Sequence, residues 1–228
     1  QIRGELDILL KNIGTFLRRD CELNHDEVED VLDNRNILDA STGIELLCPE
    51  EAHNHEEHDG HHHESDPHIW LAPENAKIMA RNICAGLTEQ YPQHESVFAD
   101  NLDLLLGKLD ELQAYGEMQL ATLSRRELIT FHDGFGYFAE AFDLTILEAV
   151  EEESGSEASA KELIHLIEEV QNHSLPAIFT EKSGSVSAAQ IISRETGCGS
   201  FPLDMAMTGD SWFDAMYHNI NTVKEALE

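Results

Sequence analysis

The chain has 228 residues, 41% of them hydrophobic, which suits one large domain or two lobes with packed cores. It carries 14 Lys and Arg against 45 Asp and Glu, for a formal net charge of -31. A surface this acidic repels nucleic-acid phosphates and anionic lipid headgroups and attracts cations, although the charge could also serve solubility alone. We therefore expect no nucleic-acid partner. No apolar run reaches the length of about 18 residues that a membrane-spanning helix needs.

The N-terminal third begins on a helical pattern, over residues 2–17, with no initiator Met, signal peptide or leading strand before it. We therefore expect either a processed form or a missing N-terminal piece. An acidic stretch follows at 20–36, and residues 37–47 read as short strands or as turns. Residues 49–66 are a low-complexity run of His, Asp and Glu, which predicts a mobile loop.

Two helices are predicted in the middle of the chain. Pro73 is suited to the first turn of a helix that continues to residue 90. The pattern over 93–123 predicts a second helix of roughly thirty residues, about 45 Å long. A helix of that length, in a chain of this size, is expected to bridge two lobes.

Strands and helices alternate after residue 123. The predicted strands are 127–131, 175–181 and 199–204, and the predicted helices are 136–142, one opened by a capping box at 159–162, 187–196 ended by Gly197, and 212–227. This alternation predicts an α/β fold in which helices cover both faces of a parallel sheet.

Three polar residues stand at the predicted strand ends. His132 follows the first strand, Glu181 ends the second, and Asp204 ends the third. Ligands of open α/β sheets bind outside the carboxyl ends of the strands, so these residues are candidate metal ligands. Taken singly, each of them could equally be a helix cap or a satisfied hydrogen-bonding partner.

The histidines near residue 60 form two groups. His68 lies in the sequence Asp-Pro-His-Ile-Trp, where proline stiffens the chain and the apolar neighbours favour a half-buried, oriented imidazole. Such a residue is either a Zn²⁺ ligand or a packed core histidine. The other group has no apolar anchor and predicts weak, rapidly exchanging metal capture, with a solvated linker or an expression tag as alternatives; it consists of His53, His55, His58, His61, His62 and His63.

Several motifs occur in a familiar order: DPHIWLAPENAKIMARNI, FHDGFGYFAEAF, SEASAKELIHLI, AIFTE and LDMAMTGDSWFDAMYHNI. Over nearly the whole chain, from about Gly4, this order resembles the zinc-specific solute-binding proteins of bacterial ABC importers. That group belongs to a metal-binding cluster that also includes manganese-binding lipoproteins. The resemblance implies two α/β lobes joined by one long helix, with the metal held between them.

The resemblance also implies a ligand set. His68 matches the second histidine ligand, His132 the third, and Asp204 the aspartate that completes the site in many members. Manganese-type members usually have glutamate where His132 stands, and imidazole favours Zn²⁺ over the harder Mn²⁺. Zinc is therefore the expected metal. Glu181 is a candidate for orienting a ligand without touching the metal itself.

The chain departs from the family pattern in two places. The family's first histidine ligand and its opening strands have no counterpart, so the N-terminal lobe is expected to be truncated, and His25 is a poor substitute. Ala72 stands where the family usually has an aspartate that caps the following helix. Losing that cap should cost about 1 kcal/mol without touching the ligands.

The domains implied are a partial N-terminal lobe at 1–92 that includes the loop 49–66, a linking helix at 93–123, and a C-terminal lobe at 124–228. The expected function is a monomeric, non-enzymatic receptor that passes Zn²⁺ to the membrane permease of an ABC importer. It would act outside the cytoplasm, in a periplasm or anchored at the outer face of a membrane.

Two other functions remain open on the sequence. A zinc hydrolase would need an open coordination position and a general base, for which Glu181 or Asp133 could serve, but no HExxH motif is present. A zinc buffer or surface adhesin without a transport partner would share the same metal site.

Overall fold

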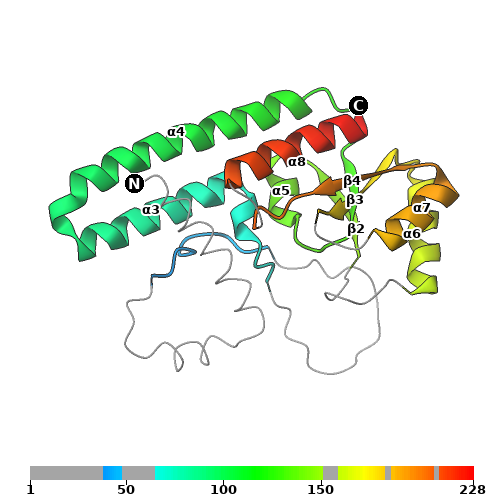
Figure 1. The fold of residues 1–228 in the computed structure, drawn as a ribbon, viewed down its shortest axis with the longest axis horizontal. Helices are drawn as coiled ribbons and strands as arrows, with labels where there is room; N and C mark the ends of the chain where they lie inside the picture. The colour runs from blue at the N-terminus through cyan, green and yellow to red at the C-terminus, as the bar shows by residue number, and fades with distance from the viewer. Residues whose placement is uncertain (1–37, 48–64, 151–158, 183–185, 208–210) are drawn as a thin grey trace, which may run out of the picture.

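The computed structural model describes residues 38–47, 65–150, 159–182, 186–207 and 211–228 (Figure 1). The helix predicted at 2–17, His25, and all six histidines of the run from 53 to 63 lie outside the described residues. The described part of the segment predicted as strands or turns, 38–47, is irregular apart from a bend at Ala40 and a turn at residues 42–43, and it forms no strand. This segment contacts the helix of residues 73–90 through Asn82, whose Nδ2 group donates hydrogen bonds to the carbonyl oxygens of Ala40 and Thr42.

A helical hairpin follows. After a 3-10 turn, η1 (Ile69–Leu71), the chain forms α3 (Pro73–Gln90), as the proline predicted; a second 3-10 turn, η2 (Pro92–His94), leads into α4 (Glu95–Leu120). Ala72 stands at the α3 N-cap without a side-chain hydrogen bond, so the cap is missing as expected. The long helix is shorter at both ends than the predicted 93–123, since Pro92 begins a 3-10 turn and residues beyond Leu120 form a turn.

Four parallel strands make one sheet in the order β2-β1-β3-β4. They are β1 (Glu127–Thr130), β2 (Thr145–Ala149), β3 (Ala177–Glu181) and β4 (Gly199–Leu203). The edge strand β2 was not predicted. Ile146, Leu147 and Ala149 do give it an apolar pattern, but that pattern is short and runs almost directly into the acidic residues 151–153.

The connecting helices begin and end at recognisable signals. They are α5 (Gly136–Ala141), α6 (Ala160–Asn172), α7 (Ser187–Thr196) and α8 (Trp212–Leu227). The predicted capping box opens α6: Glu162 N–H donates to Ser159 Oγ, and Ser159 N–H donates to Glu162 Oε2. Gly197 ends α7 with φ +80°, a left-handed conformation that costs glycine little.

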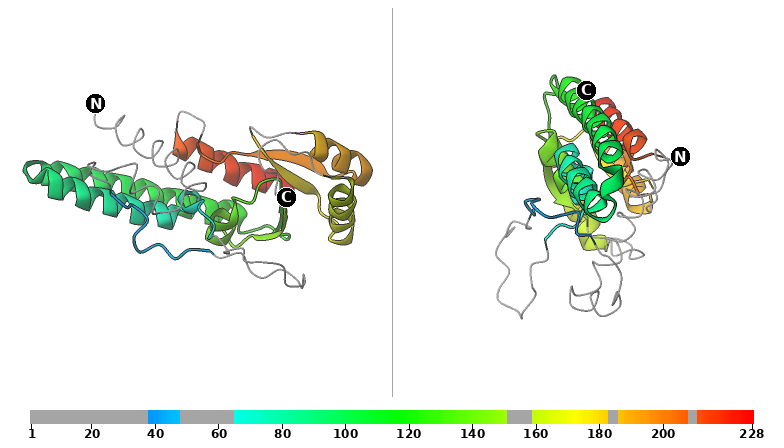
Figure 2. Two further views of the ribbon diagram at one scale, coloured as in Figure 1. Left: turned by 90° about the horizontal axis from the view of Figure 1, so that it is seen from below. Right: turned by 90° about the vertical axis from the view of Figure 1, so that its left-hand side faces the viewer.

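The two faces of the sheet build two separate clusters of buried side chains. On the α8 face, Leu128 and Phe179 pack with residues of η1, α4, α5 and α8. On the α6–α7 face, Ile129 and Ile178 pack with α6 and α7. Successive strand residues alternate between the clusters because side chains of a strand point to opposite faces in turn. Figure 2 shows α8 and α4 lying along one side of the molecule, with α6 and α7 at its far end.

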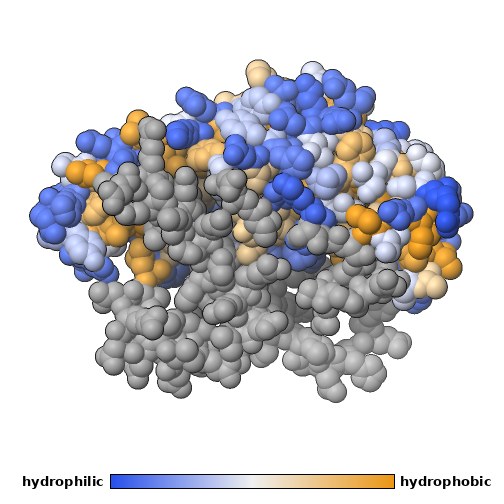
Figure 3. All heavy atoms as spheres, viewed as in Figure 1, coloured by the Kyte–Doolittle hydropathy of each residue, from blue (hydrophilic) through white to orange (hydrophobic). Residues whose placement is uncertain are grey.

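The α/β fold class, with helices on both faces of a parallel sheet, is confirmed. The long helix α4 lies beside α3 for much of its length and also packs against α8 (Figure 1). The helical hairpin of α3 and α4 is therefore joined to the sheet through α8. None of the described helices is long and apolar enough to cross a membrane. On the face drawn in Figure 3, hydrophilic side chains are interspersed with hydrophobic ones.

Candidate metal centre

The carboxyl ends of three adjacent strands bring the strand-end residues to one edge of the sheet. β1 pairs with β3 through Thr130 and Phe179, and β3 pairs with β4 up to Glu181 and Leu203. His132 lies two residues beyond β1, and Asp204 directly follows β4. The sheet edge predicted from the sequence therefore exists in the structure.

His68 is held from behind by a carboxylate. Asp66 Oδ1 lies 2.7 Å from His68 Nδ1 and also accepts the His68 backbone N–H at 2.8 Å. Both side chains are largely buried, with 16% of His68 and 15% of Asp66 exposed. An ionised carboxylate only accepts hydrogen bonds, so the proton of the His68 imidazole resides on Nδ1 and the lone pair on Nε2.

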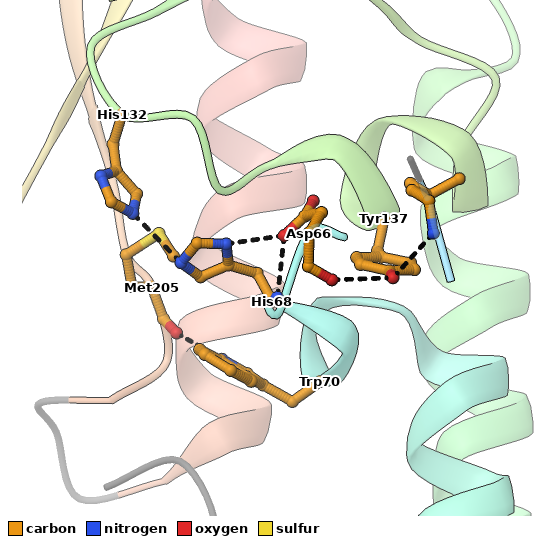
Figure 4. A network of polar contacts seen from close by, with 7 residues as sticks. Asp66, His68, Trp70, His132, Tyr137 and Met205 are labelled. Carbon is orange, nitrogen blue, oxygen red and sulfur yellow. Dashed lines mark hydrogen bonds and ion pairs between the residues drawn. The ribbon is translucent and has the colours of Figure 1, made fainter. Parts of the chain in front are cut away.

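Asp66 is itself anchored to the core. Tyr137 on α5 donates its hydroxyl hydrogen to the Asp66 carbonyl oxygen at 3.0 Å and accepts the Leu47 N–H at 3.0 Å. The Asp66 N–H donates to the Leu47 carbonyl oxygen. Figure 4 shows this chain of contacts running from Tyr137 through Asp66 to His68. The histidine therefore has a fixed position before any ligand arrives.

The two candidate histidines meet at their Nε2 atoms. His68 Nε2 and His132 Nε2 are 3.2 Å apart, and the rings are nearly perpendicular at 84° (Figure 4). Two imidazole nitrogens on one tetrahedral Zn²⁺, each at 2.0–2.1 Å, would be about 3.3–3.4 Å apart. In the neutral pair one Nε2 donates its hydrogen to the other, and a bound cation would take the place of that proton.

Burial keeps the second imidazole neutral. Removal from water lowers the pKa of His132, and the neighbouring His68 lowers it further, while Glu181 opposes both effects. A metal ligand must be unprotonated, so a lowered pKa favours metal binding near neutral pH.

Two glycines make room for the pair. A Cβ added at Gly134 would lie 2.6 Å from His132 Cδ2 and 2.8 Å from Met205 Cε. A Cβ added at Gly136 would lie 2.9 Å from Asp66 Oδ2. Any larger residue at either position would displace the imidazole or its supporting carboxylate.

Two tryptophans tie the His68 segment to the chain after β4. Trp70 Nε1–H donates to the Met205 carbonyl oxygen at 2.9 Å, and Trp212 Nε1–H donates to the Trp70 carbonyl oxygen at 3.0 Å. The Trp70 ring also meets the His68 ring edge-on, with 5.3 Å between centroids. The histidine segment and residues after β4 therefore form one connected unit.

Asp204, the third residue expected in the site, is 4% exposed and already has partners. Its Oδ2 accepts from Lys182 Nζ at 3.0 Å and its Oδ1 accepts the Ala206 N–H at 2.9 Å. Within the part of the chain that the structure describes, no group of three or more His, Cys, Asp or Glu side chains is placed to hold a metal ion. The structure thus brings two of the predicted ligands together and pairs the third with a lysine.

Sequence reasoning missed three supporting residues. Asp66 stands two positions before His68, a spacing that lets a carboxylate reach back to the imidazole, so that partner could have been found. Tyr137 and Lys182 could not, because their partners lie 71 and 22 positions away in the chain.

Comparison with known proteins gives a family match over residues 15–226, to the family described as ZnuA, zinc-uptake complex component A, periplasmic. A Treponema pallidum (strain Nichols) protein whose name refers to metal binding is 31% identical over 199 residues, 83% of this chain and 62% of that protein. The zinc-binding lipoprotein AdcA of Streptococcus pneumoniae is 29% identical over 214 residues, 87% of this chain.

The chain spans 62% and 42% of the length of these two relatives. Among solved structures, a crystal structure of ZnuA superimposes with a TM-score of 0.78 at 28% identity, covering 93% of this chain and 78% of that one. The likeness therefore extends over nearly all of the chain, in sequence and in fold.

Proposed function

The chain belongs to the ZnuA family of periplasmic zinc-uptake components, as its motifs indicated, and from this premise we propose that it is a zinc receptor of an ABC importer. In this proposal His68 and His132 bind one Zn²⁺ and Asp204 joins them as a third ligand. The protein acts as a monomer outside the cytoplasm and passes the ion to the importer's membrane permease. The observation that carries the proposal is the 3.2 Å approach of the two Nε2 atoms, with Asp66 behind His68.

Zinc is the proposed ion because the donor set is rich in imidazole. Two neutral imidazoles and one carboxylate suit Zn²⁺, whereas Mn²⁺ prefers a larger share of oxygen ligands. The carboxylate behind His68 adds a feature typical of zinc sites, since it fixes the ring and raises the basicity of the ligating nitrogen. The AdcA relative, itself named as a zinc-binding lipoprotein, supports the same choice.

The histidine-rich run is proposed as a second, weaker zinc binder that collects ions for the pair. Its six imidazoles lie among acidic residues with no large apolar side chain between them, which favours several loosely bound ions over one fixed site. Deleting residues 53–63 should remove weak zinc equivalents and leave the tight one, as isothermal titration calorimetry would show.

Titration calorimetry of the tight site tests the proposal. His132→Ala should abolish the tight zinc equivalent, while His165→Ala, which removes an exposed imidazole from α6, should retain it. Equal tight binding by the parent chain and His132→Ala would refute the receptor site.

Two further assays separate the alternatives. Turnover of an ester or peptide from a substrate panel, lost in His132→Ala, would favour a zinc hydrolase instead. Failure of the zinc-loaded protein to associate with an ABC-importer permease would favour a zinc buffer or adhesin.

A further inference from the structure

The ion pair between Lys182 and Asp204 forms just beyond the carboxyl ends of β3 and β4, at the sheet edge where His132 follows β1. Because Glu181 is in register with Leu203, the next residues of the two strands, Lys182 and Asp204, leave the sheet side by side. The Lys182 N–H donates to the Leu203 carbonyl oxygen at 2.8 Å, and its Nζ reaches Asp204 Oδ2 at 3.0 Å. The sheet itself therefore positions the ammonium against the carboxylate.

The two partners differ in their freedom to move. Asp204 is fixed: its side chain is 6% exposed, its Oδ1 accepts the Ala206 N–H, and its backbone N–H and carbonyl both bond the Asn219 side chain, at 2.7 and 2.8 Å. The Lys182 side chain is 57% exposed. The ammonium can be solvated when another cation takes its place, whereas the carboxylate cannot follow it into water.

A buried carboxylate needs a positive partner, because an unpaired charge out of water is costly. We propose that Lys182 is a built-in competitor of Zn²⁺: its ammonium holds the Asp204 carboxylate, yields it when the ion binds, and reclaims it when the ion leaves. This inference rests on the proposed function, in which Asp204 is a zinc ligand. Lys182 thereby lowers zinc affinity and speeds release, which suits a receptor that must give up its ion.

Two substitutions of Lys182 should move zinc binding in opposite directions. Lys182→Met removes the competing charge and keeps the length of the side chain, so zinc should bind roughly three- to fivefold more tightly and dissociate more slowly. Lys182→Arg replaces the ammonium with a guanidinium, which can form two parallel hydrogen bonds to a carboxylate and so binds it more strongly. Zinc should therefore bind less tightly than in the parent chain.

The experiment measures zinc affinity by competition with a fluorescent chelator, and release by stopped flow, at pH 8. It compares the parent chain, Lys182→Met and Lys182→Arg, each with Asp204 intact and with Asp204→Asn. Both Lys182 effects should disappear in the Asp204→Asn background, because no carboxylate remains to compete for. Should Lys182→Met not fold, Lys182→Arg with and without Asp204→Asn carries the same test.

Two results would overturn the inference. A Lys182→Met gain that persists in Asp204→Asn would be a general effect of charge, and unchanged zinc affinity in both Lys182 variants would leave the ion pair a purely structural contact. Failure of the proposed function looks different, since His132→Ala would then bind zinc as tightly as the parent chain.

Discussion

Two pairs of a histidine and a carboxylate lie on opposite sides of the sheet. Asp66 and His68 adjoin the α8 face, 2.7 Å apart and mostly buried. Glu148 on β2 and His165 on α6 adjoin the α6–α7 face, 3.0 Å apart, with 39% and 54% of their side chains exposed. Each pair joins an imidazole nitrogen to a carboxylate oxygen, through Nδ1 in His68 and Nε2 in His165, but their surroundings differ.

The difference shows why only one of the two pairs suits the proposed metal site. Water surrounds the His165 pair, and Glu148 raises the pKa of His165 and so favours its charged form. On the other side, the second nitrogen of His68 faces His132, whose pKa is lowered by burial and by His68. Burial and a second imidazole, rather than the carboxylate, therefore distinguish the proposed cation site from a surface ion pair.

The largest expected effects come from the cores beneath the two pairs. Leu128 and Ile129 are neighbours on β1, each 0% exposed, and they pack on opposite faces. Leu128→Ala and Ile129→Ala should each lower the free energy of unfolding by about 2–5 kcal/mol, measured by urea denaturation. Only Leu128→Ala should also weaken zinc binding at 15 °C, because its cluster contains Trp70 and Tyr137. Equal zinc affinity in both variants would mean that the α8 face does not support the site.

The sequence predicted most of the fold because its signals are local. Pro73 at the start of α3, the Ser159 capping box and Gly197 after α7 each act within a few residues of themselves. The strand β2 was missed although Ile146 and Leu147 are apolar, because this short run stands between α5 and an acidic stretch with no turn signal to mark its end.

The candidate site was predictable in part for the same reason. His68 and His132 were identified by their strand-end and motif positions, and the structure brings them together. The bond between Lys182 and Asp204 depends on two strands pairing in register, which the sequence around either residue does not encode. Whether Asp204 is a ligand stays a prediction, as does the division into two lobes.

The next largest effect is expected when the carboxylate beside each histidine is replaced by its amide. Asp66→Asn should weaken zinc binding about 10- to 100-fold, because a neutral amide oxygen holds the His68 ring less firmly and adds less to its basicity than a carboxylate does. The matched change on the other face, Glu148→Gln, should leave zinc affinity unchanged. Chelator competition measures both, and similar zinc affinities for the two variants would remove the distinction between the pairs.

A smaller effect is expected from crowding the His132 ring. Gly134→Ala should weaken zinc binding about tenfold, because the new methyl group displaces the imidazole and Met205. Gly107→Ala is the control: it lies within α4 with nothing near the added Cβ, so it should stabilise the fold by roughly 0.5–1 kcal/mol and leave zinc affinity alone. Unchanged zinc affinity in Gly134→Ala would show that His132 tolerates movement.

The smallest effect is the pH dependence of the exposed pair. Glu148 raises the pKa of His165 in the folded chain. The ion pair therefore stabilises the fold fully below the unfolded pKa of histidine, about 6.5, and this stabilisation is lost as the pH rises through the pKa of His165 in the folded chain. Solvent screening keeps it below about 0.5 kcal/mol. Glu148→Gln should therefore lower the melting temperature slightly at about pH 5.5 and not at about pH 8.5, where His165 is neutral. If Glu148→Gln lowered the melting temperature more at the higher pH than at the lower one, the predicted direction of the pH dependence would be wrong.

The most direct test of the central claim is to locate the metal. Anomalous diffraction at the zinc absorption edge, from crystals of the protein loaded with one equivalent of Zn²⁺, places the ion without assumption about its ligands. The ion should lie about 2.0–2.1 Å from both His68 Nε2 and His132 Nε2. A single tightly bound zinc that touches neither imidazole would contradict the account.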